Sequence, residues 1–128
     1  MGLRVFSERS VHNLTLVHPD LIKLAYKALQ LSSVDFGVIE GVRTLERQRE
    51  LVQEGKSQTL KSRHLSGHAI DVFAYPTPLG SWDFKYYQEI AVAFKTASQI
   101  LHIPVEWGGD WKTFCDGPHF QLPCSQYP

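Results

Sequence analysis

The chain has 128 residues, of which 43% are hydrophobic and 20% charged, and its thirteen basic residues balance thirteen acidic ones. This length and composition are typical of one globular domain, which we expect to span residues 1–128. Zero net charge argues against a nucleic-acid or anionic-membrane binder. No apolar run approaches the roughly 18–20 residues that cross a bilayer, so we expect no membrane insertion.

The N-terminal segment and the cysteines both favour synthesis in the cytoplasm. Residues 1–9 lack the long apolar stretch of a secretory signal. The two cysteines, Cys115 and Cys124, are too few for a disulfide framework, and we expect them to be reduced thiols.

The first half of the chain predicts helices around one strand. Apolar residues at helical spacing follow Pro19 and predict a helix over 19–31, with a shorter helical piece before it at about 8–14. The alternating, β-branched stretch 36–40 predicts a strand. A threonine N-cap and a closing glycine predict a second helix over 45–54.

The second half predicts a loop, three strands and a helix. Residues 56–67 are polar without a hydrophobic period and are expected to form a loop, whereas 69–73 predicts a strand. A helix is expected to start near 81–83 and to run to about 101. Short strands are expected at 105–107 and 119–122. This order favours an α+β fold, with a small, mainly antiparallel sheet backed by about three helices.

A histidine and an aspartate lie seven residues apart where the expected loop enters a strand. Imidazole nitrogen and carboxylate oxygen are both ligands of Zn²⁺, so His64 and Asp71 could hold a metal. Asp71 could equally face water on an edge strand. His68 does not complete a helical metal-binding motif, because no glutamate follows His64 and Gly67 interrupts any helix. We expect His68 to be structural or to lie in a substrate cleft.

A second candidate pair lies near the C-terminus. His119 begins an expected strand after a Gly-Pro turn, and Asp116 precedes it by three residues. If His119 is a third ligand, Asp116 lies where a general base could take a proton from an attacking water. Alternatively, Asp116 is an ordinary turn residue.

An arginine and several aromatic residues complete the candidates. Arg43 lies between an expected strand and helix, where a guanidinium could bind a carboxylate or an oxyanion, although a solvent-exposed arginine is the commoner case. Trp107, Trp111 and Tyr75 could wall a cleft or lie in the core.

Together these residues resemble a known family. The pattern Ser62-x-His64-x-x-Gly67-x-Ala69-x-Asp71, followed by Asp116-x-x-His119, is similar to the signature of the D-Ala-D-Ala carboxypeptidase/VanY group of zinc peptidases, which shares the hedgehog domain fold. The segment Gly41-x-Arg43-Thr44-x-x-x-Gln48 is also similar. Within this group, the chain most resembles small phage endolysins that are L-alanyl-D-glutamate peptidases.

The resemblance implies a role for each matching residue. One Zn²⁺ per chain would be held by His64, Asp71 and His119, with Asp116 as general base. Arg43 would hold the scissile carbonyl or a substrate carboxylate. Further substrate contacts are expected from Ser62, His68, Gln48 and Trp107.

The resemblance also implies a substrate and a setting. The expected activity is hydrolysis of the L-alanyl-D-glutamate bond in peptidoglycan stem peptides, leading to host lysis. We expect a monomer without a separate cell-wall-binding domain, which reaches periplasmic murein after a separate membrane-permeabilising factor releases it. A D-Ala-D-Ala dipeptidase or carboxypeptidase, and a non-catalytic zinc-stabilised peptidoglycan-binding module, are the alternatives.

Overall fold

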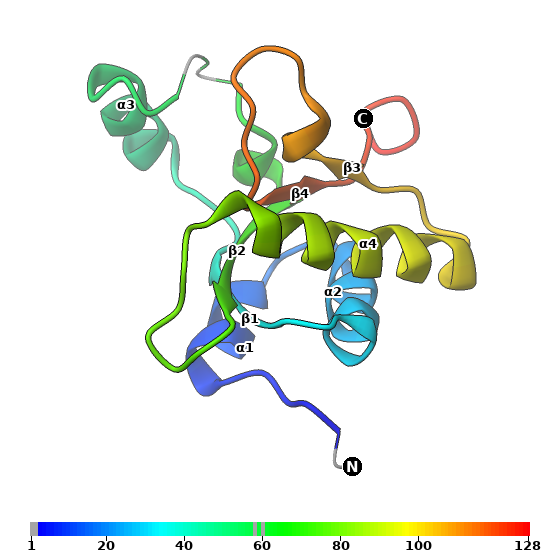
Figure 1. Cartoon of the computed structure of the whole chain (residues 1–128). Coiled ribbons are helices and arrows are strands. Elements are labelled where there is room, and N and C mark those ends of the chain that lie inside the picture. The colour runs from blue at the N-terminus through cyan, green and yellow to red at the C-terminus, as the bar shows by residue number, and fades with distance from the viewer. Residues whose placement is uncertain (1–2, 58, 60) are drawn as a thin grey trace.

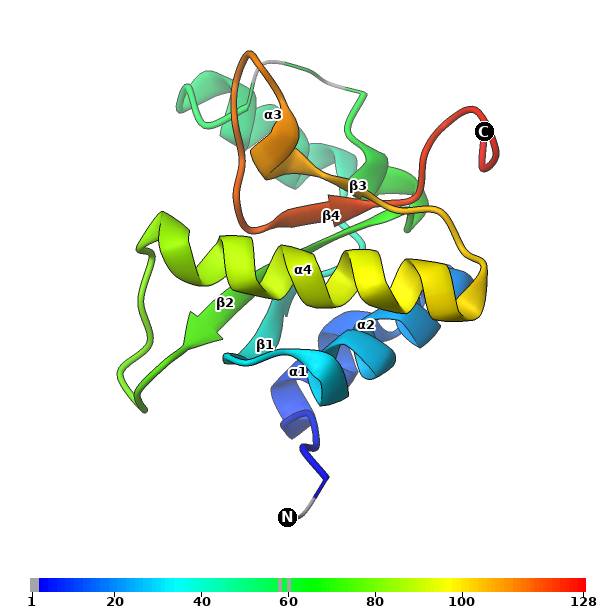
Figure 2. The ribbon, with the colours of Figure 1, turned by 45° about the vertical axis from the view of Figure 1, so that its right-hand side comes forward.

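A computed structural model describes residues 3–57, 59 and 61–128 (Figures 1 and 2). Its helices and strands follow in the order α1 Glu8–Leu14, α2 Pro19–Leu31, β1 Asp35–Glu40, α3 Leu45–Gln53, β2 Ala69–Tyr75, α4 Phe84–Leu101, β3 Glu106–Trp107 and β4 His119–Gln121. Two short 3₁₀ helices cover Arg63–Ser66 and Gly108–Asp110. These bounds lie within a few residues of the predicted ones.

The four strands form one antiparallel sheet in the order β1-β2-β4-β3. This arrangement confirms the predicted α+β class. Four α-helices are described rather than about three, and the additional one is the short piece expected before α2.

One correction concerns the expected loop 56–67, of which Gln58 and Leu60 lie outside the described residues. Its end is not loop but the 3₁₀ helix Arg63–Ser66. The Ser62 side chain caps this helix by accepting from the His64 backbone N–H, and Gly67 ends it at φ 77°, in the left-handed region that glycine adopts without strain. These signals are local hydrogen bonds and backbone geometry, so hydrophobic periodicity could not reveal them.

Helices α2 and α4 cover one face of the sheet (Figures 1 and 2). Alternate strand residues point toward them, and Phe94 of α4 packs with ring centroids 5.7 Å from Phe36 and 4.0 Å from Phe120. Since Ile70 and Val72 of β2 are fully buried in this core, Asp71 between them points to the other face. The alternation thus directs a carboxylate away from the helical layer.

A β-bulge in β1 completes the polar row on that other face. Val38 pairs with Val72, but the next pair is Glu40 with Asp71, so one residue of β1 is unmatched. The bulge therefore turns Glu40 to the face of Asp71, as bulges commonly re-aim a side chain near a site. On the other side of β2, Asp71 pairs directly with His119 of β4. Three chemically active side chains consequently lie side by side across three strands.

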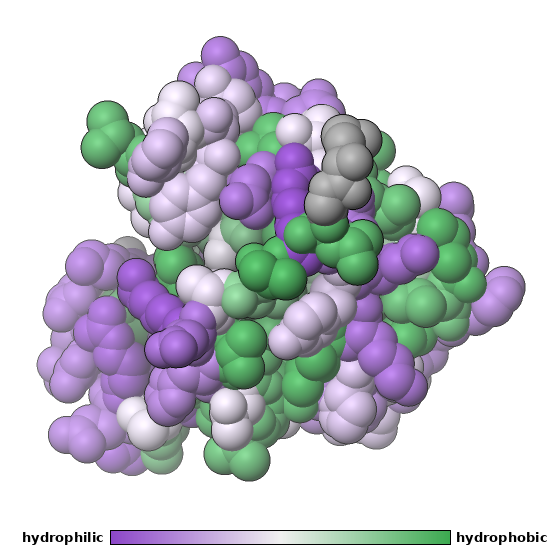
Figure 3. Space-filling view, turned by 90° about the horizontal axis from the view of Figure 1, so that it is seen from below, coloured by the Kyte–Doolittle hydropathy of each residue, from purple (hydrophilic) through white to green (hydrophobic). Residues whose placement is uncertain are grey.

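The surface contains apolar as well as polar residues, as globular surfaces normally do. Seen from below, hydrophobic residues gather in the middle of the molecule between polar ones (Figure 3). None of the helices in the described part of the chain has the length and apolar character needed to cross a bilayer.

Candidate active site

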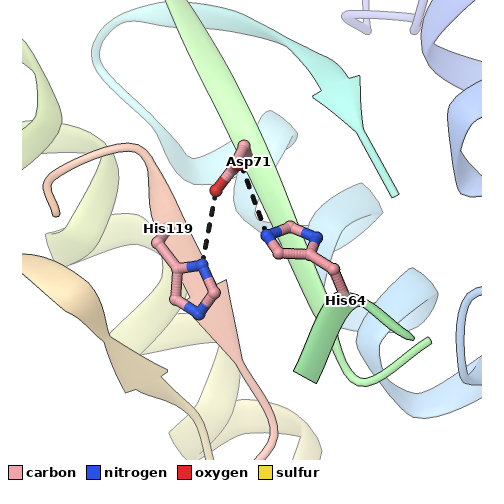
Figure 4. A group of neighbouring side chains, drawn as sticks. All are labelled: His64, Asp71 and His119. Atoms are coloured by element: carbon pink, nitrogen blue, oxygen red, sulfur yellow. Dashed lines mark ion pairs between the residues drawn. The ribbon is translucent and has the colours of Figure 1, made fainter. Parts of the chain in front are cut away.

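Three side chains converge on the face of the sheet opposite α2 and α4 (Figure 4). The His64 Nε2 atom lies 3.3 Å from Asp71 Oδ2, and His119 Nδ1 lies 3.4 Å from Asp71 Oδ1. One potential ligand atom from each residue lies within 4.8 Å of the other two. The structure thus brings together the three residues that the sequence proposed as metal ligands.

The remaining nitrogen of each histidine is held by a hydrogen bond away from the cluster. His64 Nδ1 lies 2.9 Å from the Gly41 carbonyl oxygen, which can only accept, so this nitrogen carries the proton. His119 Nε2 lies 2.8 Å from Gln121 Oε1, and the Gln121 amide nitrogen donates to Glu106 at 3.2 Å. When these hydrogen bonds fix the tautomers, lone pairs of both rings face Asp71, as in metal sites with oriented histidines.

The polar atoms of the cluster fit a cation. His64 Nε2 and Asp71 Oδ1 are buried without a hydrogen-bond partner among the described residues, and such buried polar atoms are costly unless something binds them. A divalent cation would satisfy both. Two imidazoles and one carboxylate leave a tetrahedral ion one open position, which is the pattern of catalytic rather than structural sites.

Asp71 and His119 shift each other's pKa in opposite directions. Burial alone would raise the pKa of Asp71, but the neighbouring His64 and His119 hold it well below its usual range. Burial would lower the pKa of His119, yet the neighbouring Asp71 carboxylate outweighs that effect and raises it. The site therefore favours an anionic Asp71 and attracts positive charge.

Arg43 lies beside this cluster in a fixed network. Its guanidinium donates to both carboxylate oxygens of Glu40 at 2.7 and 2.6 Å, to Gln48 Oε1 at 2.7 Å, and to Asp71 Oδ2 at 3.4 Å. These bonds use four of the five N–H donors of an arginine. Arg43 is only 8% exposed, so its side chain orients Asp71 instead of extending into solvent.

Asp116 lies on the loop between β3 and β4 and faces the same cleft. Its backbone N–H donates to the Gly108 carbonyl, and its carbonyl accepts from the His119 N–H at 3.2 Å. A Cβ on Gly108 would lie 2.3 Å from the Asp116 carbonyl oxygen, so this close approach requires glycine. Burial, and then the charge of Asp71, raise the pKa of Asp116, which suits a proton acceptor working near neutral pH.

The cleft around these residues has a volume of about 530 Å³, within the usual range of ligand sites. Beyond the residues already described, its walls carry polar and aromatic side chains: Lys56, Ser57, Thr59 and Ser62 on one side, and Trp111 and Phe114 on the loop that carries Asp116. Trp111 packs on His119, with ring centroids 5.0 Å apart.

Three expected substrate contacts do not line this cleft. His68 packs beside His18 and Tyr127 instead. Trp107 is 7% exposed and packs between Phe84 and Phe120, with its indole N–H bonded to the Gly117 carbonyl. Both side chains are thus occupied by packing contacts.

Gln48, the third, is fully buried behind the cleft and binds Arg43. Ser62 does line the cleft. Tyr75 lies at a separate surface hollow formed by residues 35 and 75–78.

Sequence reasoning also missed residues. Phe114, Lys56 and the Gln121 support of His119 were not singled out, because no local pattern connects them with the ligands. Only the alternation along β4, which places Gln121 on the same side as His119, carried a signal. The two cysteines are both free and exposed, and Cys115 donates to the Gly109 carbonyl instead of joining the metal cluster.

Comparison with known proteins places the chain in a family. The family model for the phage L-alanyl-D-glutamate peptidase matches residues 1–122. The chain is 33% identical over 115 residues to the L-alanyl-D-glutamate peptidase of Escherichia phage T5, covering 87% of this chain and 84% of that protein. It is 31% identical over 125 residues to the enzyme of the same name from Listeria phage A118, covering 95% of this chain but only 43% of the relative.

A solved structure extends the likeness to three dimensions. The crystal structure of the Serratia marcescens L-Ala D-Glu endopeptidase ChiX matches with a TM-score of 0.91 and 53% sequence identity, over 97% of this chain and 94% of that one. Sequence, fold and site geometry lead to the same assignment: the chain belongs to the phage L-alanyl-D-glutamate peptidase family.

Proposed function

We propose that this protein is a zinc-dependent endopeptidase that hydrolyses the L-alanyl-D-glutamate bond of peptidoglycan stem peptides. The observation that carries the proposal is the convergence of two histidine lone pairs and a buried Asp71 oxygen in a cleft that also contains Asp116. The choice of scissile bond is supported by relatives that match most of this chain and are named for cleaving the L-alanyl-D-glutamate bond.

The ligand set supports zinc as the ion. Imidazole nitrogen with one carboxylate oxygen suits Zn²⁺, whereas Mg²⁺ and Ca²⁺ prefer sites built from oxygen alone. His64, Asp71 and His119 would hold the ion. Once bound, it would polarise the scissile carbonyl and make the attacking water more acidic.

The remaining residues of the cleft would transfer protons and orient the reacting groups. Asp116, with its raised pKa, would accept a proton from the attacking water and pass it to the leaving amine of the D-glutamate residue. Arg43 would keep the Asp71 carboxylate in place, and its one unengaged N–H donor would be available to the carbonyl oxygen. The aromatic side chains of Trp111 and Phe114 would wall the bound peptide.

Phage relatives suggest where the enzyme acts. We infer that the substrate is murein in the periplasm, reached after a separate membrane-permeabilising factor releases the enzyme, and that the enzyme works as a monomer.

Product mapping on defined muropeptides tests the proposal. Mass spectra should show cleavage between L-alanine and D-glutamate, lost on zinc removal by a chelator and restored by zinc. Release of the terminal D-alanine would instead identify a carboxypeptidase, and binding of muropeptides without products would identify a non-catalytic module. Unchanged cleavage in protein shown to contain no metal would refute zinc dependence.

A further inference from the structure

The cleft contains a cation that the proposed reaction has not yet used. Of the basic side chains lining it among the described residues, Arg43 is committed to Glu40, Gln48 and Asp71. A guanidinium paired with a carboxylate through two hydrogen bonds is largely neutralised, so it competes poorly for another carboxylate. Lys56 is the other lysine or arginine on the cleft wall.

The Lys56 ammonium group is free to bind a new partner. Its Nζ atom forms an ion pair with Glu54 Oε1 at 3.3 Å. Both side chains are largely exposed, Lys56 at 67% and Glu54 at 47%. Exposed pairs of this kind contribute little and are readily exchanged. An incoming carboxylate could therefore take the place of Glu54 with little loss.

The backbone beneath Lys56, by contrast, is fixed. Gly55, two residues after the end of helix α3, has φ 75°. Its N–H donates to the Val52 carbonyl, and the Lys56 N–H donates to the Leu51 carbonyl at 2.8 Å. These two hydrogen bonds form a Schellman motif, which favours a glycine in the left-handed conformation and defines where the chain leaves the helix. The root of the Lys56 side chain is thus anchored.

Ser57 and Thr59 are anchored as well. The buried Gln48 amide nitrogen donates to Ser57 Oγ at 2.9 Å and to the Thr59 carbonyl at 2.5 Å, while its oxygen accepts from Arg43. Gln48 therefore connects the arginine beside the metal ligands to the cleft wall that begins at Lys56. A mobile ammonium group on such a fixed base suits recognition of a charged ligand near the reacting centre.

We propose that Lys56 is a specificity-determining residue that binds the free carboxylate of the D-glutamate residue, next to the scissile bond. This inference rests on the proposed function, because it requires an L-alanyl-D-glutamate substrate. It implies that the enzyme prefers stem peptides in which this carboxylate is free over stem peptides in which it is a carboxamide. The charges in the cleft support this assignment, because Glu40 neutralises Arg43 and Lys56 is left to pair with the substrate carboxylate.

The test compares two stem peptides that differ only in this group, carboxylate or carboxamide. Wild-type enzyme should cleave the carboxylate form with about tenfold higher kcat/KM, the value of one charge-assisted hydrogen bond. Lys56→Met should reduce this ratio toward one, mainly through the KM of the carboxylate substrate, while Lys56→Arg should preserve it. Lys61→Met is the matched control, because Lys61 lies on the same segment but not on the cleft wall.

The outcomes separate the two proposals. If wild-type enzyme cleaves both peptides equally well, or if Lys56→Met keeps the wild-type ratio, the role of Lys56 is refuted and the peptidase function stands. A similar loss of preference in Lys61→Met would also refute it, because a general effect of surface charge would then explain the ratio. If neither peptide is cut between L-alanine and D-glutamate, the proposed function fails, and the inference with it.

Discussion

Replacing Gln121 with leucine is expected to weaken zinc binding without touching a ligand. Gln121 Oε1 accepts from His119 Nε2 at 2.8 Å, and its amide nitrogen is held by Glu106 at 3.2 Å. Glu106 and Gln121 are direct partners in the β3–β4 pairing, so the support is built into the sheet. Leucine leaves the His119 ring without an acceptor, and the proton is no longer held on the nitrogen that faces away from the metal.

The expected loss is about 10–100-fold in metal affinity, the usual effect of removing such a partner, which corresponds to about 1.4–2.8 kcal/mol. Competition with a chromophoric zinc chelator measures it directly. Glu106→Gln is the matched control, since its amide oxygen can still accept from the Gln121 amide nitrogen, so Gln121 Oε1 stays on His119 and affinity should be retained. Wild-type zinc affinity in Gln121→Leu, with an unchanged unfolding temperature of the metal-free protein, would show that this support is not needed.

Three further predictions follow from the same site. Asp116→Asn should lower kcat by about 10²–10⁴-fold, the usual range for a lost acid–base group, while zinc content measured by atomic absorption stays at the wild-type level; a parallel loss of zinc would make Asp116 a ligand. Gly41→Ala should weaken zinc binding and lower the free energy of unfolding by about 1–3 kcal/mol. The new Cβ would lie 1.8 Å from a backbone oxygen and displace the carbonyl that holds His64. Denaturant titration measures the stability loss, and wild-type stability would contradict the prediction. Because Asp71 raises the pKa of His119, protons should compete with zinc at a pH above the ordinary histidine pKa of about 6.5. Chelator competition at decreasing pH should show the zinc affinity falling before pH 6.5 is reached. A zinc affinity that stays constant through pH 6.5 would count against ligation by His119.

Elements with strong local signals could be predicted from the sequence. Pro19 at a helix start, a threonine N-cap before α3 and the alternation of β2 each act within a few residues, and the structure places those elements within a few residues of expectation. The three candidate metal ligands could also be predicted, the spacing of His64 and Asp71 suggesting two of them and the resemblance to zinc peptidases implying His119. The sequence alone could not show that Asp71 and His119 are neighbours, because this depends on the pairing of β2 with β4. The structure contains that pairing, with Asp71 directly opposite His119.

What the sequence could not predict depends on contacts between distant segments. Trp107 and Trp111 flank the same glycine-rich segment, and no local property distinguishes the core residue from the cleft residue. Trp107 is buried because β3 lies against Phe84 and Phe120, whereas Trp111 emerges after the 3₁₀ helix and reaches His119. The bulge that turns Glu40 toward Asp71 is likewise a property of strand pairing, and it explains why Arg43 is held at the site.

The opposite pKa shifts of Asp71 and His119 have one cause, and it links metal uptake to the fold. The sheet register places an imidazole beside a carboxylate in a buried position, so each favours the charged form of the other: the pKa of Asp71 is lowered and that of His119 is raised. A zinc ion would place a larger positive charge beside Asp71, held by three segments far apart in the sequence. Because the antiparallel pairing of β2 with β4 aligns Asp71 with His119, an ion bound by both side chains would also hold these two strands together, so metal uptake is expected to stabilise this part of the sheet.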